Sequence, residues 1–305
     1  MASMKKIFIS LVFLSILLPR GGAIGQTPTD SLTSQLFDLA ICSNSDDIQP
    51  EILRLLGEGV NVNAKDKDGA TLLLQAAEYC ESPDVAQLLL EHGADVNAKD
   101  NTAHTPLIEA AQHSVPSVVK LLLEHGADVN ANVDGAGTPI IFALMGDNEH
   151  DDSTMIQNAT LLLEHGSDIE AVGKRGETPL MLATRDDDMV VVLKLLLDKG
   201  ARIEARDNNG DTALFYSGGA EKAMAALLDH GAKIEAKNNA GTTPLMQATA
   251  LGHLNTVKLL LARGAKVNIK DKHGLTALGE VMRSIYLNRS QKTRMIKLLR
   301  AHGAH

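Results

Sequence analysis

Apolar and polar positions along the chain follow one pattern that is repeated several times. The phrase Leu-Leu-Leu-Glu-His-Gly occupies residues 88–93, 121–126 and 161–166, and looser copies occupy 195–200, 226–231 and 259–264. A second phrase, Thr-Pro-Leu or a variant of it, has its threonine at 71, 105, 138, 178, 212, 243 and 276. The successive threonine spacings are 34, 33, 40, 34, 31 and 33. A period near 33 over most of the chain predicts a solenoid, in which short units stack on one another.

The chemistry of one period, residues 100–132, predicts two helices. Thr105 can cap the first helix with its hydroxyl, and Pro106 suits the first helical position because its missing N–H has no partner there. The second helix is predicted for residues 117–124 and is apolar around more than half of its circumference, as a helix between neighbours must be. Gly126 is the expected left-handed stop. The fold class is therefore an all-α repeat solenoid of about eight helix–turn–helix units, connected by β-hairpin loops.

The expected units can be delimited from these phrases. After a short linker at 26–33, the array fills 34–305, with units at 34–65, 66–99, 100–132, 133–172, 173–206, 207–237, 238–270 and 271–305. The first and last units are caps, because one face of each must meet water. The unit 133–172 carries a surplus at about 147–154, which we expect to be a loop between its helices. Gly218 and Gly219 disfavour helix, so the unit 207–237 is expected to be the weakest joint.

These residues resemble the ankyrin repeat family. Its phrases Thr-Pro-Leu-His-x-Ala-Ala and Leu-Leu-x-x-Gly-Ala-Asp-Val-Asn-Ala appear here as residues 105–111 and 122–131, and the resemblance covers about 34–305. It implies units of hairpin, inner helix and outer helix, stacked into a curved array whose concave face binds partners. The histidine of the first phrase is replaced at each copy, by Leu74, Ile108, Ile141, Met181, Phe215, Met246 and Gly279. We therefore expect apolar packing where the family has a polar ladder.

The N-terminal segment has the features of a targeting signal. Lys5 and Lys6 precede an apolar run at 7–18, and small residues at 21–25 follow it. This order is typical of a secretory signal peptide, so we expect residues 1–25 to be removed and the protein to be periplasmic or secreted. An uncleaved N-terminal anchor is the alternative. Removal of Lys5, Lys6 and Arg20 leaves 26 basic and 38 acidic residues, a net charge of −12.

The amino-acid composition disfavours several classes of function. The chain is 3% aromatic with no tryptophan, which disfavours a large aromatic-lined pocket. Its formal net charge of −9 disfavours nucleic acid as a partner, because phosphates need clustered lysine and arginine. Two cysteines cannot form a disulfide scaffold. Cys42 and Cys80 fall at different places in their units, so we expect no disulfide between them, with Cys42 buried.

Clusters of chemically active residues are explained mostly by the repeat. His92, His125, His165, His230 and His302 all precede the glycine of a unit, which indicates a role at the helix C-terminus rather than a metal site. Residues 149–152 and 186–188 are expected to be solvated acidic loops, although the first could hold a divalent cation. No catalytic arrangement stands out, so we expect a protein that is not an enzyme and has no cofactor.

Binding is the function that the architecture favours. Positions that vary between units lie at the hairpin tips and at the inner-helix ends, which the resemblance places on the concave face. The predicted partner-binding residues are Lys67, Asp68, Glu78, Tyr79, Thr102, His104, Gln112, His113, Met145, Lys174, Arg175, Arg185, Leu251 and Arg283. Tyr79, His113, Met145 and Leu251 are the preferred anchors.

Three functions remain open on the sequence. The favoured one is an exported module that binds a protein partner, either as its stabiliser or as an inhibitor or immunity partner. The others are a structural component of the cell envelope and a metal-dependent enzyme. Residues 281–305 contain six basic and no acidic residues, so 26–280 carry 20 − 38 = −18. This basic end is either a solubilising cap or a contact for an anionic surface through Arg289, Lys292 and Arg294, which we expect on a long exposed loop.

Overall fold

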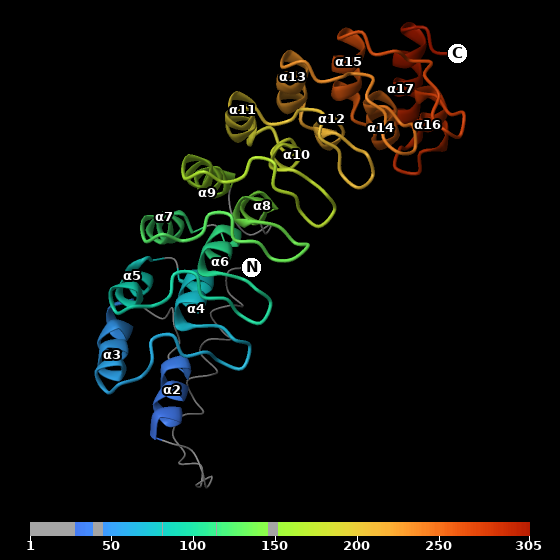
Figure 1. Cartoon of the computed structure of the whole chain (residues 1–305). Helices are drawn as coiled ribbons and strands as arrows, with labels where there is room; N and C mark the ends of the chain where they lie inside the picture. The colour runs from blue at the N-terminus through green and yellow to red at the C-terminus, as the bar shows by residue number, and fades with distance from the viewer. Residues whose placement is uncertain (1–27, 39–44, 81, 114, 146–151) are drawn as a thin grey trace.

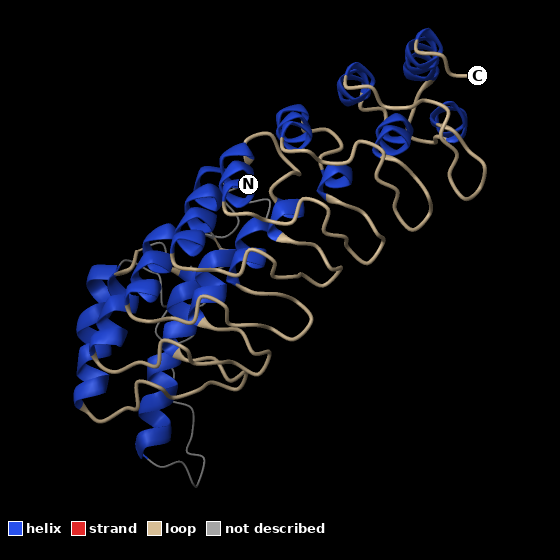
Figure 2. Cartoon of the chain, turned by 45° about the horizontal axis from the view of Figure 1, so that its top comes forward, coloured by secondary structure: helices blue, strands red, loops and turns tan. Residues whose placement is uncertain are grey.

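The computed structural model describes residues 28–38, 45–80, 82–113, 115–145 and 152–305, so the predicted signal peptide and Cys42 lie outside the described residues. Helices alternate between two rows along a curved array (Figure 1, Figure 2). The inner row contains α2 (Pro28–Asp38), α4 (Leu72–Tyr79), α6 (Pro106–Gln112), α8 (Pro139–Met145), α10 (Pro179–Leu182), α12 (Ala213–Tyr216), α14 (Pro244–Leu251) and α16 (Ala277–Arg283). The outer row contains α3 (Ser45–Gly57), α5 (Asp84–Glu91), α7 (Pro116–Glu124), α9 (Asp152–Glu164), α11 (Val190–Asp198), α13 (Glu221–Asp229), α15 (Leu254–Ala262) and α17 (Arg289–Ala301). The all-α solenoid predicted from the sequence is confirmed.

The starts of the inner helices follow the threonine phrase. The hydroxyl oxygens of five threonines accept the N–H three residues ahead at 3.4 Å: Thr71, Thr105, Thr178, Thr243 and Thr276. Thr212 makes no such bond at the start of α12, and the buried hydroxyl of Thr138 has no partner. The predicted caps are thus present in most units, because an extended residue before the first turn places its oxygen over an otherwise unbonded amide.

The ends of the outer helices are equally regular. The glycine that closes each unit has a φ between 83° and 92°: Gly59, Gly93, Gly126, Gly166, Gly200, Gly231, Gly264 and Gly303. Only glycine adopts this left-handed conformation without steric cost. In the five units that place a histidine before it, Nδ1–H donates to the carbonyl four residues earlier, at 2.7–2.9 Å. The histidine side chains therefore bind a carbonyl in the last turn of the helix, which confirms their structural role.

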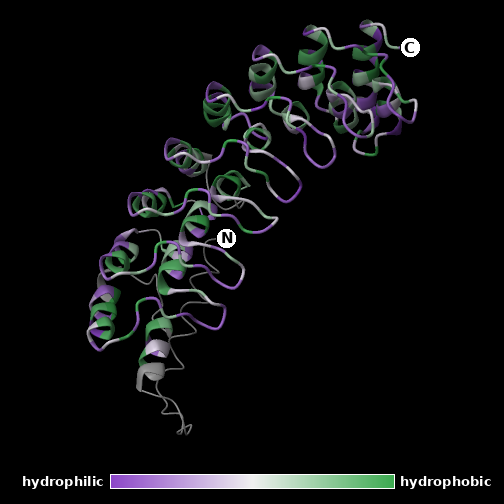
Figure 3. Ribbon diagram, viewed as in Figure 1, coloured by the Kyte–Doolittle hydropathy of each residue, from purple (hydrophilic) through white to green (hydrophobic). Residues whose placement is uncertain are grey.

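The core is one hydrophobic cluster to which both rows contribute, and the hydrophobic residues lie mainly in the helices of the two rows (Figure 3). Alanines such as Ala76, Ala110 and Ala143 are fully buried in the inner helices, and their small side chains allow consecutive helices to approach closely. The positions where the family has a histidine are apolar and buried in six units, as predicted: Leu74, Ile108, Ile141, Met181, Phe215 and Met246. Cys80 is a buried thiol. Within the described chain, no helix is long and apolar enough to span a membrane.

The predicted β-hairpins are tight turns rather than strand pairs. Among the described residues, only isolated bridges form, between Lys65 and Thr71 and between Val133 and Gly137. An Asp or Asn side chain explains the difference: in the first such turn, Asp66 Oδ1 accepts the N–H of both Asp68 and Ala70 at 2.9 Å. Once a side chain binds these amides, they are no longer available to a strand ladder. Ala103 fills a place that is glycine in other turns, with a φ of 67°.

One side-chain position links every unit to the next across the base of these turns. In the first units it is an asparagine, whose Oδ1 accepts a backbone N–H of the following unit at 2.7–2.8 Å: Asn63 from Asp95, Asn97 from Asp128 and Asn130 from Asp168. In the middle units it is a glutamate, bonded at 2.6–2.7 Å to a basic residue's N–H: Glu170 to Arg202, Glu204 to Lys233 and Glu235 to Lys266. An asparagine acceptor is paired with an acidic donor residue, and a glutamate acceptor with a basic one. None of these pairs therefore brings two like charges together.

Two predicted boundaries are wrong. The proposed linker 26–33 is helical from Pro28, because proline suits the first turn of α2. The surplus at 147–154 is not all loop, since α9 begins at Asp152 and is 13 residues long, whereas α7 has 9. Asp and Ser are favourable residues for a helix start, so the chain lengthens the outer helix instead. Residues 149–151 of the acidic segment lie outside the described residues.

The unit 207–237 contains the features of the expected weak joint, together with one reinforcement. α12 is four residues long and ends just before Ser217, Gly218 and Gly219. The reinforcement comes from the preceding unit: Asp187 Oδ1 accepts the N–H of Lys222 at 2.7 Å and of Ala223 at 3.1 Å. A carboxylate predicted to be merely solvated therefore caps α13 across the joint.

We expect amide hydrogen exchange to be fastest at 212–226 among the internal units, because this unit combines a four-residue inner helix with two glycines after it. Asp187→Ala should accelerate exchange at Lys222 and Ala223 about fivefold, from a capping contribution of about 1 kcal/mol. Exchange monitored by mass spectrometry measures both effects. Asp188→Ala in the same turn is the control and should change little. Uniform protection across 70–270 would contradict the prediction.

Candidate partner-binding surface

The inner helices end on one side of the array, and several predicted binding residues lie at these ends. Tyr79, Gln112, Met145 and Leu251 are the last residues of α4, α6, α8 and α14. The exposed fraction is 60% for Tyr79, 43% for Met145 and 41% for Leu251, whereas Gln112 is half-buried. These residues lie in the last turn of inner helices, seven or eight positions after the threonine of each unit, and the inner helices stand in one row along the array (Figure 1).

Two arginines continue this row toward the C-terminal end. Arg185 follows α10 and Arg283 is the last residue of α16, and both are exposed. We call the positions at the inner-helix ends, with Glu78 and His113 beside them, the inner-face row. Its composition changes along the array, from aromatic and acidic near α4 to basic at α16. A partner that lies along the curve would therefore meet chemically different groups at each unit.

The predicted hairpin-tip residues are exposed as a second line. Lys67 and Asp68 are highly exposed and lie 4.0 Å apart, Nζ to Oδ2, and Lys174 is also exposed. Thr102 is exposed, but its hydroxyl donates to Asp100 in its own turn at 2.9 Å. Exposed pairs of this kind contribute little to stability, so these side chains are available to a partner.

Arg175 is more firmly held. Its Nε lies 3.0 Å from Oε1 of Glu177, and its backbone N–H donates to the other carboxylate oxygen at 2.6 Å. Glu177 is buried, which alone would raise its pKa, but the bonds from backbone amides and from Arg175 hold the pKa below its ordinary value. Because Gly173 stands where other turns have an Asp or Asn, Glu177 supplies the carboxylate of this turn. Arg175 thus belongs to the turn as well as to the surface.

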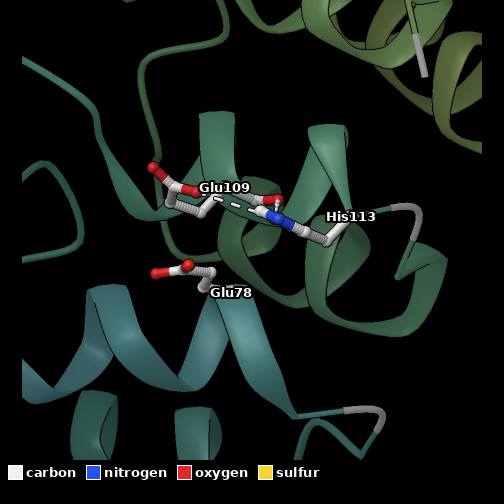
Figure 4. A group of neighbouring side chains, drawn as sticks. All are labelled: Glu78, Glu109 and His113. Carbon is white, nitrogen blue, oxygen red and sulfur yellow. Dashed lines mark hydrogen bonds and ion pairs between the residues drawn. The ribbon is translucent and has the colours of Figure 1, made fainter. Parts of the chain in front are cut away.

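A polar cluster beneath the inner-face row surrounds Glu109, which the sequence analysis did not identify (Figure 4). Glu109 is 8% exposed. His104 Nδ1 lies 2.5 Å from its Oε1, and His113 Nδ1 lies 3.6 Å from its Oε2 and 3.0 Å from its backbone carbonyl. His104 also packs edge-to-face on Phe142 with ring centroids 5.3 Å apart. Both predicted binding histidines are therefore half-buried and tied to Glu109.

The environment of Glu109 favours its protonated form. Burial raises the pKa of its carboxyl, and the nearby carboxylate of Glu78 raises it further. The contacts with His104 and His113 oppose this rise, but the net shift is upward. The cluster thus combines a desolvated carboxyl with two imidazoles and a second carboxylate.

Glu78, Glu109 and His113 are also the residues of the described chain that could together hold a cation. Their ligand atoms lie within 4.8 Å of one another. Ligands 2.0–2.2 Å from a tetrahedral ion lie about 3.5 Å apart, so these side chains would have to close in, and a structural zinc site needs a fourth ligand. As arranged, His113 contacts Glu109, and the carboxylate of Glu78 lies close to both at the edge of the inner-face row.

The signal that could have identified Glu109 is local spacing. Glu109 and His113 are four residues apart on one helix, which places them on the same face. His104 precedes the helix, and its contact with Glu109 in the first turn is seen only in the folded structure. Met282, Ile285 and Tyr286, which are strongly exposed at the end of α16 and just after it, were not predicted from the sequence either.

The raised pKa of Glu109 predicts a pH dependence of stability. A carboxyl whose pKa is higher in the folded than in the unfolded state binds more protons when folded, so stability declines as pH rises from its ordinary pKa of 4.5 through the raised value. Glu109→Gln keeps the shape without the charge. We expect its free energy of unfolding, relative to the parent, to increase with pH across this window. Urea denaturation at several pH values measures it.

The exposed Glu164→Gln is the matched control and should follow the parent at every pH. A constant difference between Glu109→Gln and the parent over the whole range would show that Glu109 is not destabilised by ionisation. The titratable side chains that face Glu109 are His104, His113 and Glu78.

Comparison with known proteins agrees with this architecture. The profile described as "Ankyrin repeats (3 copies)" matches residues 37–133, 152–238, 192–271 and 217–305. No curated protein matches the chain. The overlapping matches cover most of the array, and they coincide with the alternating helices and the glycine-terminated units described above. The chain belongs to the ankyrin repeat family.

Proposed function

We propose that this chain is an exported, non-catalytic module that binds a protein partner along the inner-face row. Ankyrin repeats indicate a protein–protein interaction module. One observation supports this surface most directly: Tyr79, Met145 and Leu251 are large and exposed at equivalent inner-helix ends, while the core lies between the rows. Exposing apolar side chains to water is unfavourable, and their burial under a partner is favourable.

The surface suits a partner that follows the curve over several units. Each inner-helix end offers one side chain, so contacts spread along the array rather than collect in a pocket. The hairpin-tip residues Lys67, Asp68 and Lys174 would form the polar rim beside apolar anchors, as interfaces commonly do. Whether the module stabilises its partner or inhibits it depends on the partner's own chemistry.

Export is part of the proposal and rests on residues 1–25. The basic start, apolar run and small residues predict cleavage after Gly25. Expression with the native leader, followed by mass spectrometry of the periplasmic and extracellular fractions, tests it. A mature chain that begins at Gln26 is the expected result. A full-length chain held in the membrane fraction would support the uncleaved anchor instead.

The interface is tested by changing two anchors together, Tyr79→Ser and Met145→Ser. His113 is left intact because its bond to Glu109 makes a change there a stability change as well. We expect the double variant to lose about 2 kcal/mol or more of binding free energy, about thirtyfold in Kd, with a nearly unchanged Tm. Crosslinking in the native compartment identifies the partner, and calorimetry with that partner measures Kd.

Val191→Ser is the matched control, because Val191 is 61% exposed but lies on the outer helix α11. It should leave Kd unchanged. Equal affinity for the parent and the double variant would show that the partner binds elsewhere. Recovery of no discrete partner by the parent would favour a structural envelope component.

A further inference from the structure

The strongest unexplained surface of the described chain is the loop that joins α16 to α17. Ile285 is 87% exposed, Tyr286 71% and Met282 63%, the three highest values among the large hydrophobic residues that the structure describes. They lie within five positions of one another in the terminal unit of the array (Figure 1). We call Met282, Ile285 and Tyr286 the apolar tip.

The loop that carries the tip is firmly anchored. Ser284 donates its hydroxyl to the carbonyl of Ala250 at 2.6 Å, and Leu287 is 7% exposed. Leu287 packs so closely on Gly252 that a Cβ there would lie 2.3 Å from its Cδ2. Since Ser284 and Leu287 face inward, the two residues between them face solvent. The exposure of Ile285 and Tyr286 is therefore a consequence of a defined loop conformation.

The start of α17 fixes the other side of the loop. Asn288 accepts the N–H of Gln291 and the Gln291 side chain accepts the N–H of Asn288, both at 2.9 Å. This reciprocal cap starts the helix at Arg289, so Arg289, Lys292 and Arg294 lie on a helix rather than on the long loop predicted from the sequence. Lys292 Nζ also donates a hydrogen bond to the carbonyl of Met282 at 3.1 Å, so this side chain is held at the end of α16.

The basic side chains near the apolar tip contribute little to the stability of the fold. Arg289 occupies the first turn of α17, where the helix dipole repels positive charge. Residues 281–305 contain no Asp or Glu, and in the described chain none of their basic side chains forms an ion pair. Arg283, Arg289 and Arg294 are exposed. Three exposed cations without an ion pair thus lie within eight residues of the apolar tip along the chain.

We propose that this end of the array docks on an anionic lipid bilayer, with Ile285 and Tyr286 entering the interfacial region and Arg283, Arg289 and Arg294 binding lipid headgroups. An aliphatic and an aromatic side chain beside cations match the two layers of a bilayer surface, apolar below and anionic above. The apolar tip projects from the chain, so it suits insertion into a bilayer better than enclosure by a protein groove.

Charge segregation sets the orientation of the docked molecule. Residues 281–305 carry +6, whereas 26–280 carry −18. An anionic surface attracts the terminal unit and repels the rest, so the array would stand away from the membrane on this end. The anchors Tyr79, Met145 and Leu251 of the inner-face row would remain open to a partner. This inference does not depend on the proposed protein partner, because the two surfaces share only Arg283.

The test uses the full mature chain and vesicles made of equal parts of phosphatidylcholine and phosphatidylglycerol, with pure phosphatidylcholine vesicles for comparison. We expect binding to the anionic vesicles that weakens as salt is raised. Arg283→Gln, Arg289→Gln and Arg294→Gln together should weaken it about a hundredfold, from about fivefold per charge. Ile285→Ser with Tyr286→Ser should weaken it about tenfold or more. Co-sedimentation measures both.

Insertion itself is read by Tyr286→Trp. The chain has no tryptophan, so the emission of this variant reports on position 286 alone. A blue shift with anionic vesicles, and quenching by brominated acyl chains, are the expected results. Circular dichroism confirms that each variant folds.

Matched controls are Val191→Ser for the apolar pair and Lys194→Gln, Lys199→Gln and Lys258→Gln for the charges, all at exposed outer-row positions. Both should bind vesicles like the parent. Binding that ignores the Ser pair, or a tryptophan that stays in water, would reduce the contact to electrostatic adsorption and overturn insertion. The proposal is overturned if the parent does not bind vesicles, or if it binds neutral vesicles equally well. It is also overturned if changing the tip abolishes binding to an acidic protein partner and leaves vesicle binding unchanged.

Discussion

The contact between one unit and the next is the interaction on which this structure depends. Neighbouring inner helices pack through buried alanines, and an Asn or Glu at the base of each turn accepts a backbone N–H from the following unit. Where this acceptor is Asn97, the donor residue is Asp128; where it is Glu204, the donor is Lys233. A charged acceptor and an acidic neighbour would repel each other, so both positions have to change together. In a solenoid the stability is close to a sum of such nearest-neighbour terms.

This constraint accounts for the regular positions and frees the others. A position that meets the next unit must be small, apolar or a turn-former, which is why leucine, alanine and glycine return at the same places. Side chains at the turn tips and inner-helix ends meet water, and there the units differ. The exposed row of Tyr79, Met145 and Leu251 is made of such unconstrained positions. A partner-binding surface can therefore vary along the array without disturbing its core.

The irregular places show where local structure serves more than stacking. Glu109 is buried beside Glu78 and compensated by His104 and His113, a costly arrangement that sits at the edge of the inner-face row. The C-terminal unit keeps its capping and its core contact through Leu287, yet holds Ile285 and Tyr286 in solvent. Ordinary capping of a solenoid end requires polar residues, so these apolar ones mark a second surface. The two surfaces share only Arg283, and the apolar side chains of each lie on different units.

The sequence alone determined the family, the helix pairs, most helix caps and the left-handed glycines, because each depends on residues within about four positions of one another and is repeated. It also predicted the exposure of Tyr79, Met145 and Leu251, since these break the repeat at solvent-facing places. The cap of α17 is local as well, because Asn288 and Gln291 are three residues apart, although the three cations were predicted to lie on a loop. Only the tertiary structure showed that Asp187 caps α13 and that His104 reaches Glu109. These contacts join different units or depend on how a turn closes, and a 33-residue period contains no information about either.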